Sequence, residues 1–373
     1  ARKNLLLGDY KQIPPCANED VIAACEAEEI DTRLLNMSFF EYVFESIRKK
    51  TIKEMESQGL DKSIILKPVL EDYIPESYKQ FDPNVVQDMI LRVVRDPKKL
   101  VNLNSQFRMP ENISDIISEW FYEGNYHSSY DMTRFEPMVP GTDKPLVVIS
   151  TSKSKKHGES QPASKMGYQN HYEAQLIANI VANVINSQPE RLREEFIEKI
   201  EDNIGIISAY GAQVRLIREY LSKRKLGIKA SQIRSMVASL DSFQGQERPL
   251  ILYSLTRSTT YKSPEVGRVG FMRELRRLNV AFTRCQKQLV IVGDVNYLSE
   301  CMNMEKVIDD ASDWSCANME ENFVVNQEYI EQCAECPAIC ERKFARFMRL
   351  LMQHVKDGAG NIINSEQLIG KDA

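Results

Sequence analysis

Apolar and polar positions along the 373-residue chain follow the pattern of strands that alternate with helices. Short apolar runs predict parallel strands that are buried on both faces. Such strands are expected at residues 5–7, 101–103, 145–150, 203–208, 233–239, 250–255 and 288–293. Helical spacing of apolar residues predicts helices at residues 19–58, 113–121, 173–185, 213–221 and 274–283. This alternation predicts an α/β fold whose parallel sheet is covered on both faces.

Three segments depart from the alternation. Residues 59–100 are charged and contain four prolines, so we expect an insertion or a lid. Residues 151–169 are rich in serine and lysine, which predicts a mobile polar loop. Residues 296–373 are mostly helical in pattern and less regular.

The amino-acid composition limits the classes of protein to which the chain can belong. The chain is 43% hydrophobic and 27% charged, which is typical of a globular protein. No stretch has the apolar length of a membrane span, so no membrane partner is expected. The net charge of −5 gives no global basic field, although a single groove can still be basic. No secretion signal is recognised, so we expect the eight cysteines to be free thiols in a reducing compartment, the cytosol or the nucleus.

Arginines gather in the segment 270–284, which also carries an asparagine and a threonine. Packing alone does not require these side chains. The planar guanidinium of Arg284 matches phosphate oxygens and would stabilise negative charge on a γ-phosphate. Alternatively, the segment is an exposed helix whose arginines form surface salt bridges.

Three further segments carry polar chemistry. Residues 8–15 follow a predicted strand, where Gln12 can bind a phosphate and a water, unless the segment is only a turn. Phe107 and Arg108 could stack on a base and bind a phosphate, or be a core aromatic and a surface charge. Residues 239–247 offer hydroxyls, amides and a glycine to a phosphate backbone, or form an ordinary polar loop.

The order and the residues of these segments resemble motifs III to VI of superfamily 1 helicases. The similar branch includes the RNA-surveillance helicase and the Okazaki-fragment nuclease-helicase. The matching segments are Gly8–Pro15, Gln106–Met109, Ser239–Glu247 and Arg276–Arg284. Phe107 stands where the family has tyrosine, and Ser239 where it has threonine. The resemblance covers about residues 1–295.

The resemblance implies a fold and a set of site residues. The family has two RecA-like domains of the P-loop NTPase fold, with ATP between them and single-stranded DNA or RNA across the top. Residues 1–140 would be the C-terminal part of the first domain, 144–296 the second, and 297–373 a mostly helical extension. The implied contacts are Gln12, Arg108 and Arg284 with the γ-phosphate, Phe107, Gly245 and Glu247 with the rest of the nucleotide, and Ser239, Ser242 and Gln244 with nucleic acid.

One departure from the family concerns phosphate and metal binding. The sequence has neither a Gly-x-x-x-x-Gly-Lys-Ser/Thr loop nor an Asp-Glu strand end for Mg²⁺. In the family both precede motif III, so we expect this chain to be the C-terminal portion of a longer 5′ to 3′ motor. Alone it should hydrolyse ATP poorly. The alternative is a non-catalytic module, derived from a helicase, that binds nucleic acid or protein.

Cysteines near the C-terminal end form a weak metal-site candidate. Cys333, Cys336 and Cys340, with Cys316 as a fourth ligand, could hold zinc or part of an iron–sulfur cluster. Pro337 favours a loop there. No second Cys-x-x-Cys pair is present, so buried or free thiols are the alternative.

Overall fold

The chain divides into two compact units in the computed structural model. One unit comprises residues 1–103 and 305–339, and the other residues 104–304 and 340–373. The described residues are 9, 12, 19–28, 57, 103–122, 124, 126–154, 158–164, 167–258, 269–299 and 337–367. Of the first unit's predicted elements, helix α1 (Glu19–Ala27) lies where a helix was expected. The predicted strand at 5–7 and the whole of the predicted insertion at 59–100 lie outside the described residues.

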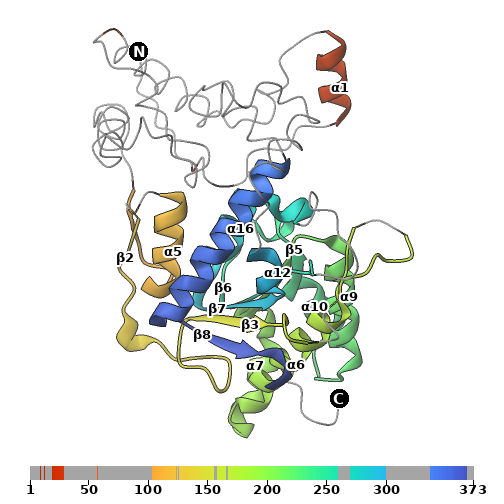
Figure 1. Ribbon diagram of the computed structural model, residues 1–373. Coiled ribbons are helices and arrows are strands. Elements are labelled where there is room, and N and C mark those ends of the chain that lie inside the picture. The colour runs from red at the N-terminus through yellow and green to blue at the C-terminus, as the bar shows by residue number, and fades with distance from the viewer. Residues whose placement is uncertain are drawn as a thin grey trace, which may run out of the picture. The chain divides into compact units, whose positions relative to one another are not determined.

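A six-stranded parallel sheet forms the centre of the second unit (Figure 1). Its strand order is β5-β4-β6-β7-β3-β8. The strands are β3 (Leu146–Ser150), β4 (Ile204–Ser208), β5 (Val237–Ser239), β6 (Arg248–Ser254), β7 (Cys285–Gly293) and β8 (Gly360–Asn364). Because all neighbours are parallel, the carboxyl ends of all six strands lie along one edge of the sheet.

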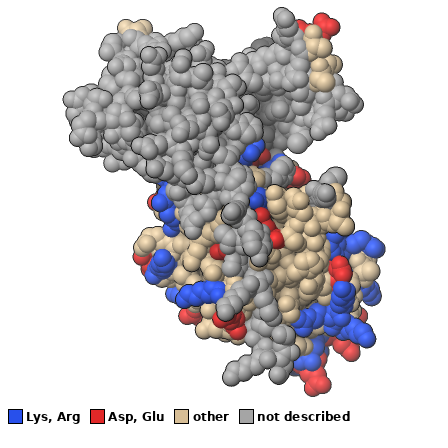
Figure 2. Space-filling view, turned by 45° about the vertical axis from the view of Figure 1, so that its right-hand side comes forward, with Lys and Arg blue, Asp and Glu red and all other residues tan. Residues whose placement is uncertain are grey.

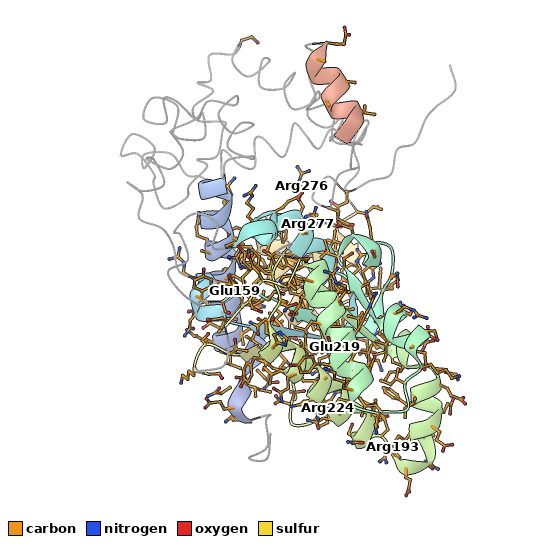
Figure 3. All side chains as sticks on the ribbon, turned by 90° about the vertical axis from the view of Figure 1, so that its right-hand side faces the viewer. Glu159, Arg193, Glu219, Arg224, Arg276 and Arg277 are labelled. Carbon is orange, nitrogen blue, oxygen red and sulfur yellow. The ribbon has the colours of Figure 1, made fainter. Side chains whose placement is uncertain are left out.

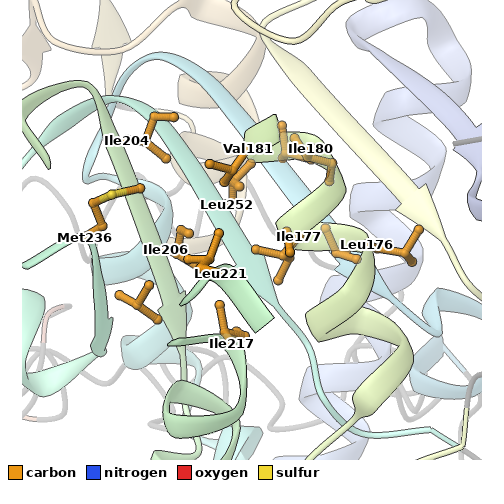
Figure 4. Packing of buried hydrophobic residues seen from close by; sticks show 14 of the residues in the cluster. Leu176, Ile177, Ile180, Val181, Ile204, Ile206, Ile217, Leu221, Met236 and Leu252 are labelled. Carbon is orange, nitrogen blue, oxygen red and sulfur yellow. The ribbon is translucent and has the colours of Figure 1, made fainter. Parts of the chain in front are cut away.

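One face of the sheet packs against α6 (His171–Ser187) and α9 (Gly211–Lys223). In Figure 4, Ile177 of α6 and Ile217 of α9 lie near Leu252 of β6, and all three side chains are fully buried. α6 begins at the predicted place because the Asn170 side chain accepts a hydrogen bond from the backbone N–H of Glu173. This apolar cluster fixes the strand ends that carry the loops described below.

The other face is covered by α5 (Glu111–Phe121), α11 (Leu275–Phe282) and α16 (Pro337–His354). Phe282 packs edge-on against Tyr253 of β6, with ring centroids 5.8 Å apart, and contacts Phe347 of α16 at 5.9 Å. The expected α/β fold with a parallel sheet covered on both faces is therefore confirmed. No helix among the described residues is long and apolar enough to cross a membrane.

Two elements differ from the expected pattern. Residues 233–236 belong to α10 (Ala230–Met236) and not to a strand, because the Gln232 side chain accepts from the Lys229 N–H and caps a helix. Residues 360–364, expected in a mostly helical extension, form the edge strand β8. A Cβ on Gly360 would lie 2.5 Å from the Leu146 carbonyl oxygen, so glycine permits this close pairing.

The first predicted strand of this region is also displaced. Residue 103 is irregular, and the strand β1 (Ser105–Gln106) pairs in parallel with β2 (His127–Ser128). The pairing places Gln106 at the start of a tight turn, where the first candidate site segment begins.

Candidate functional site

The turn after β1 is organised by the side chain of Gln106. Its Oε1 accepts from the backbone N–H groups of Arg108 and Met109, at 2.8 and 2.7 Å, and its Nε2 donates to the Met109 carbonyl at 2.8 Å. Gln106 and Met109 are buried, whereas Phe107 is 76% exposed. The turn therefore presents Phe107 on the surface, where an aromatic ring is available to a ligand.

Three segments that the sequence singled out meet at Arg108. The Arg108 Nε donates to a carboxylate oxygen of Glu247, and its Nη1 donates to the Thr283 carbonyl at 3.1 Å. These partners are 139 and 175 residues away along the chain. The fold thus brings the predicted motif IV, V and VI segments into one cluster.

Arg284 lies beside this cluster and is only 6% exposed. Its Nε donates to the Val280 carbonyl at 3.0 Å, and its Nη2 donates to the Thr283 hydroxyl at 3.2 Å. Burial lowers the pKa of Arg284, and the positive charge of Arg108 lowers it further, while Glu247 acts in the opposite direction. No carboxylate of the described residues forms an ion pair with Arg284.

Arg277 lies in α11 and is labelled in Figure 3, and its environment differs from that of Arg284. Its Nη1 donates to both carboxylate oxygens of Asp241, at 2.9 and 3.1 Å, and its Nε donates to Glu274 at 2.9 Å. Burial lowers the pKa of Arg277, but the combined effect of the two carboxylates is larger, so its pKa is raised. Arg277 therefore fits the salt-bridge interpretation, and Arg284 fits the ligand-binding one.

The loop after β5 presents polar groups on the surface. The hydroxyls of Ser239 and Ser242 lie 2.9 Å apart, and Gln246 Nε2 donates to the Ser242 carbonyl at 3.1 Å. Phe243 is buried and anchors the loop, whereas Ser242 and Gln244 are exposed. Gly245 has a φ of +80°, which favours glycine at that position. The hydroxyls of Ser239 and Ser242 and the side-chain amide of Gln246 therefore lie together at the carboxyl end of β5.

Gln12 belongs to the other compact unit. Its Nε2 donates to Asp9 Oδ2 at 2.9 Å, and its backbone N–H donates to the Asp9 carbonyl at 3.2 Å, which closes a turn. Its role beside Arg108 and Arg284 stays a prediction.

The cysteine candidate falls mostly outside the described residues, which omit Cys316, Cys333 and Cys336. Cys340 lies in α16, and Pro337 is the first residue of that helix. The expected loop is therefore wrong at Cys340, because proline is tolerated in the first turn, where its missing N–H is not needed. Among the described residues, no group of three or more potential ligands could hold a metal ion.

The sequence did not predict a buried ion pair that involves residues 151–169, the segment expected to be a mobile loop. Glu159 accepts from the Arg257 Nε at 2.7 Å and from the Ser258 N–H at 2.8 Å, and both charged side chains are buried. The Arg257 guanidinium also lies 4.0 Å from the centroid of the Tyr168 ring. An acidic residue in a lysine-rich loop was the only signal in the sequence, and it does not identify its partner.

A buried carboxyl group was also missed, at the start of α6. Glu173 is fully buried, and its Oε2 accepts from the Ser254 hydroxyl at 2.6 Å and the Thr256 N–H at 2.8 Å. Burial raises the pKa of Glu173 to about 8, although these two hydrogen bonds act in the opposite direction. Glu173 therefore binds a proton where an exposed carboxyl group would be charged.

Comparison with known proteins agrees with the motifs. A family model described as an AAA domain matches residues 85–296, more than half of the chain. The DNA polymerase alpha-associated DNA helicase A of Schizosaccharomyces pombe is 29% identical over 237 residues, which cover 59% of this chain and 33% of the relative. Helicase SEN1 of Saccharomyces cerevisiae is 29% identical, with 62% of this chain and 10% of the relative covered. A regulator of nonsense transcripts 1 homolog of Arabidopsis thaliana is 29% identical, with 58% and 16% covered.

The fold, the motifs and these similarities agree on one class of protein, the superfamily 1 helicases with a RecA-like parallel sheet. The chain belongs to the AAA domain family and matches the C-terminal motor region of these helicases. The aligned region spans a third or less of the length of the three curated relatives named above.

Proposed function

We propose that this helicase-derived chain takes part in ATP-driven movement along single-stranded DNA or RNA, in the 5′ to 3′ direction and inside the cell. The observation that carries the proposal is the environment of Arg284. A buried guanidinium cannot lose its proton near neutral pH, so its charge needs compensation. Arg284 has neutral hydrogen-bond partners, and the charge of Arg108 lowers its pKa more than the charge of Glu247, which is paired with Arg108, raises it. A bound anion would supply the missing compensation.

The γ-phosphate of ATP is the anion we propose. Arg108 would exchange part of its contact with Glu247 and the Thr283 carbonyl for phosphate oxygens, while Arg284 turns toward them. The exposed ring of Phe107 supports a stacking contact with adenine, with Glu247 and Gly245 near the ribose or the phosphates. Gln12 stays a proposed γ-phosphate contact on the strength of the motif III resemblance alone.

Mg²⁺ and the phosphate-binding loop need residues that this sequence does not contain. We propose that other residues of the same motor supply them. When bound, Mg²⁺ would neutralise phosphate charge during phosphoryl transfer. The residues of this chain would sense the γ-phosphate and stabilise the charge that develops on it.

The loop at the carboxyl end of β5 is the proposed contact with the strand. Ser239, Ser242 and Gln244 offer hydroxyl and amide groups that hydrogen-bond to phosphate oxygens and carry no base preference. The loop also contains Asp241, which binds Arg277 of the motif VI helix. Strand contact at this loop would therefore act on α11, the helix that ends at Phe282, two residues before Arg284.

The test is ATP hydrolysis by the full-length motor, measured with and without oligo(dT) or oligo(U). We expect the strand to stimulate turnover, and the more effective strand identifies the substrate. Turnover that is absent, or indifferent to both strands, would contradict the proposal.

A non-catalytic binding module is the second candidate. The absence of a Gly-x-x-x-x-Gly-Lys-Ser/Thr loop from this sequence favours it. That module predicts strand binding with the same Kd in the presence and absence of ATP, whereas a motor predicts a Kd that changes with ATP.

A further inference from the structure

A basic surface covers α9, α10 and the connection between them. Residues 211–236 contain seven basic residues and one acidic residue, Glu219, in a chain whose net charge is −5. The basic residues are Arg215, Arg218, Lys223, Arg224, Lys225, Lys229 and Arg234. We call this the α9–α10 basic surface. In Figure 2, lysine and arginine side chains gather on the lower right of the molecule, the side on which α9 lies in Figure 1.

Most of these charges lack an acidic partner. Lys223 pairs with Glu219 at 2.5 Å, and Arg224 donates to the Asn179 side chain. Arg215, Lys225, Lys229 and Arg234 are exposed, and none forms an ion pair with a described residue. Neighbouring helix α7 (Glu190–Glu198) differs, since it carries four glutamates and two arginines. The basic surface is thus a local feature and not the average of the chain.

Two arginines of the surface lie close together without a carboxylate between them. The Arg218 guanidinium donates to the Val237 carbonyl at 2.6 and 3.0 Å and to the Arg234 carbonyl at 3.2 Å. Burial lowers the pKa of Arg218, and the charge of Arg234 lowers it further. An anion bound here would offset the repulsion between the two guanidinium groups.

The position of the surface suggests which anion it binds. Arg218 is held against Val237, the first residue of β5, and β5 ends at Ser239. β5 is also an outermost strand of the described sheet, and no further strand among the described residues flanks α9 and α10 at that edge. Arg218 therefore lies against the strand that ends in the loop, whereas the connection between α9 and α10 lies toward the amino end of the strands, because α9 runs back from the carboxyl end of β4. A single strand that leaves this loop carries one phosphate per nucleotide and would reach the whole surface by passing along β5 from its carboxyl end toward its amino end.

We propose that the α9–α10 basic surface binds the phosphate backbone of the nucleic-acid strand beyond the loop of Ser239, Ser242 and Gln244. The inference rests on the proposed function, because it extends the same strand path. It predicts a site longer than the loop alone, with contacts that are electrostatic and independent of base sequence.

The test compares strands of two lengths by fluorescence anisotropy with the 373-residue chain. The probes are labelled oligo(dT) of about 10 and about 30 nucleotides, the shorter one matching a compact single-strand site. The variant is Arg215→Gln, Lys225→Gln and Arg234→Gln, which keeps Arg218 and its backbone contacts. The control, Arg191→Gln, Arg193→Gln and Lys199→Gln, removes three charges from the region of α7. Thermal unfolding of both variants checks that the fold is retained.

We expect the variant to bind the long strand at least tenfold more weakly and the short strand as the parent does. Three lost phosphate contacts should also reduce the salt slope of log K for the long strand by about 2. The control variant should match the parent on both strands.

Three results would overturn the inference. Equal weakening of both strands would place the charges in the loop site itself. Unchanged binding of both strands would mean that the surface serves another partner, such as an acidic protein. A parent chain that binds neither strand at low salt would contradict the proposed function as well.

Discussion

Arg257 and Arg284 are both buried arginines of one compact unit, and their surroundings are opposite. Arg257 is 3% exposed and forms an ion pair with Glu159 at 2.7 Å. Arg284 is 6% exposed and is bound by a carbonyl and a hydroxyl. A buried charge with an oppositely charged partner stabilises a particular fold. A buried charge without such a partner lowers the stability of the fold, and binding of an oppositely charged ligand can offset that loss. The difference separates a structural arginine from a candidate ligand-binding one.

The largest expected effect comes from breaking the compensated site. Glu159→Ala leaves the charge of Arg257 buried without a partner and should lower the free energy of unfolding by about 3–5 kcal/mol. Urea denaturation measures it. The matched control is Glu195→Ala, which removes an exposed pair with Lys199 and should lower the free energy of unfolding far less, because solvent screens that pair. Equal effects of the two variants would mean that the buried pair does not hold the loop.

Glu173 is a buried acid that has no basic partner among the described residues. Unlike an arginine, it can take up a proton, and burial raises its pKa from 4.5 to about 8. The folded state then binds the proton more tightly than the unfolded state. Stability is fully present below pH 4.5 and falls as the pH rises toward 8, by at most about 1.4 kcal/mol per pH unit. Between these pH values the denaturation midpoint of the parent should fall as the pH rises, and that of Glu173→Gln should change less. Parallel pH profiles of the two proteins would contradict the raised pKa of Glu173.

The smallest effect is expected at Arg277, which has two acidic partners. The Asp241 side chain is 57% exposed, and Glu274 remains when Asp241 is changed. Asp241→Asn should therefore cost about 1 kcal/mol or less in unfolding free energy. A loss as large as that of Glu159→Ala would show that Arg277 depends on one partner, as Arg257 does.

The sequence predicted those parts of the fold that local pattern determines. The segments 113–121, 145–150 and 203–208 became α5, β3 and β4, because each carries its apolar spacing within a few residues. Strand β8 was not predictable in this way. Its sequence, Gly-Asn-Ile-Ile-Asn, is short and half polar, and it becomes a strand by pairing with β3, which is distant in sequence.

In the candidate site, too, the local sequence identified some residues, whereas the contacts of others depend on residues that are distant in sequence. The motifs identified Arg108, Glu247 and Thr283 as parts of candidate segments, and the fold brings these residues together. The sequence analysis chose Arg284 for the γ-phosphate, but it could not show that Arg277 is paired, since its partner Asp241 is 36 residues away. Glu159 was missed for the same reason, because its partner is 98 residues away.

The most direct test of the central claim is the strand-stimulated turnover and the stability of Arg284→Gln, measured in the same full-length motor. We expect a loss of turnover of about 10³-fold in this variant, the scale of an arginine that stabilises transferred phosphate charge. It also predicts an unchanged or higher free energy of unfolding, since an uncompensated buried charge is removed. Lys287→Gln, which removes a charge from neighbouring β7, should leave both quantities unchanged. Parental turnover in Arg284→Gln, or a stability loss like that of Glu159→Ala, would contradict the account.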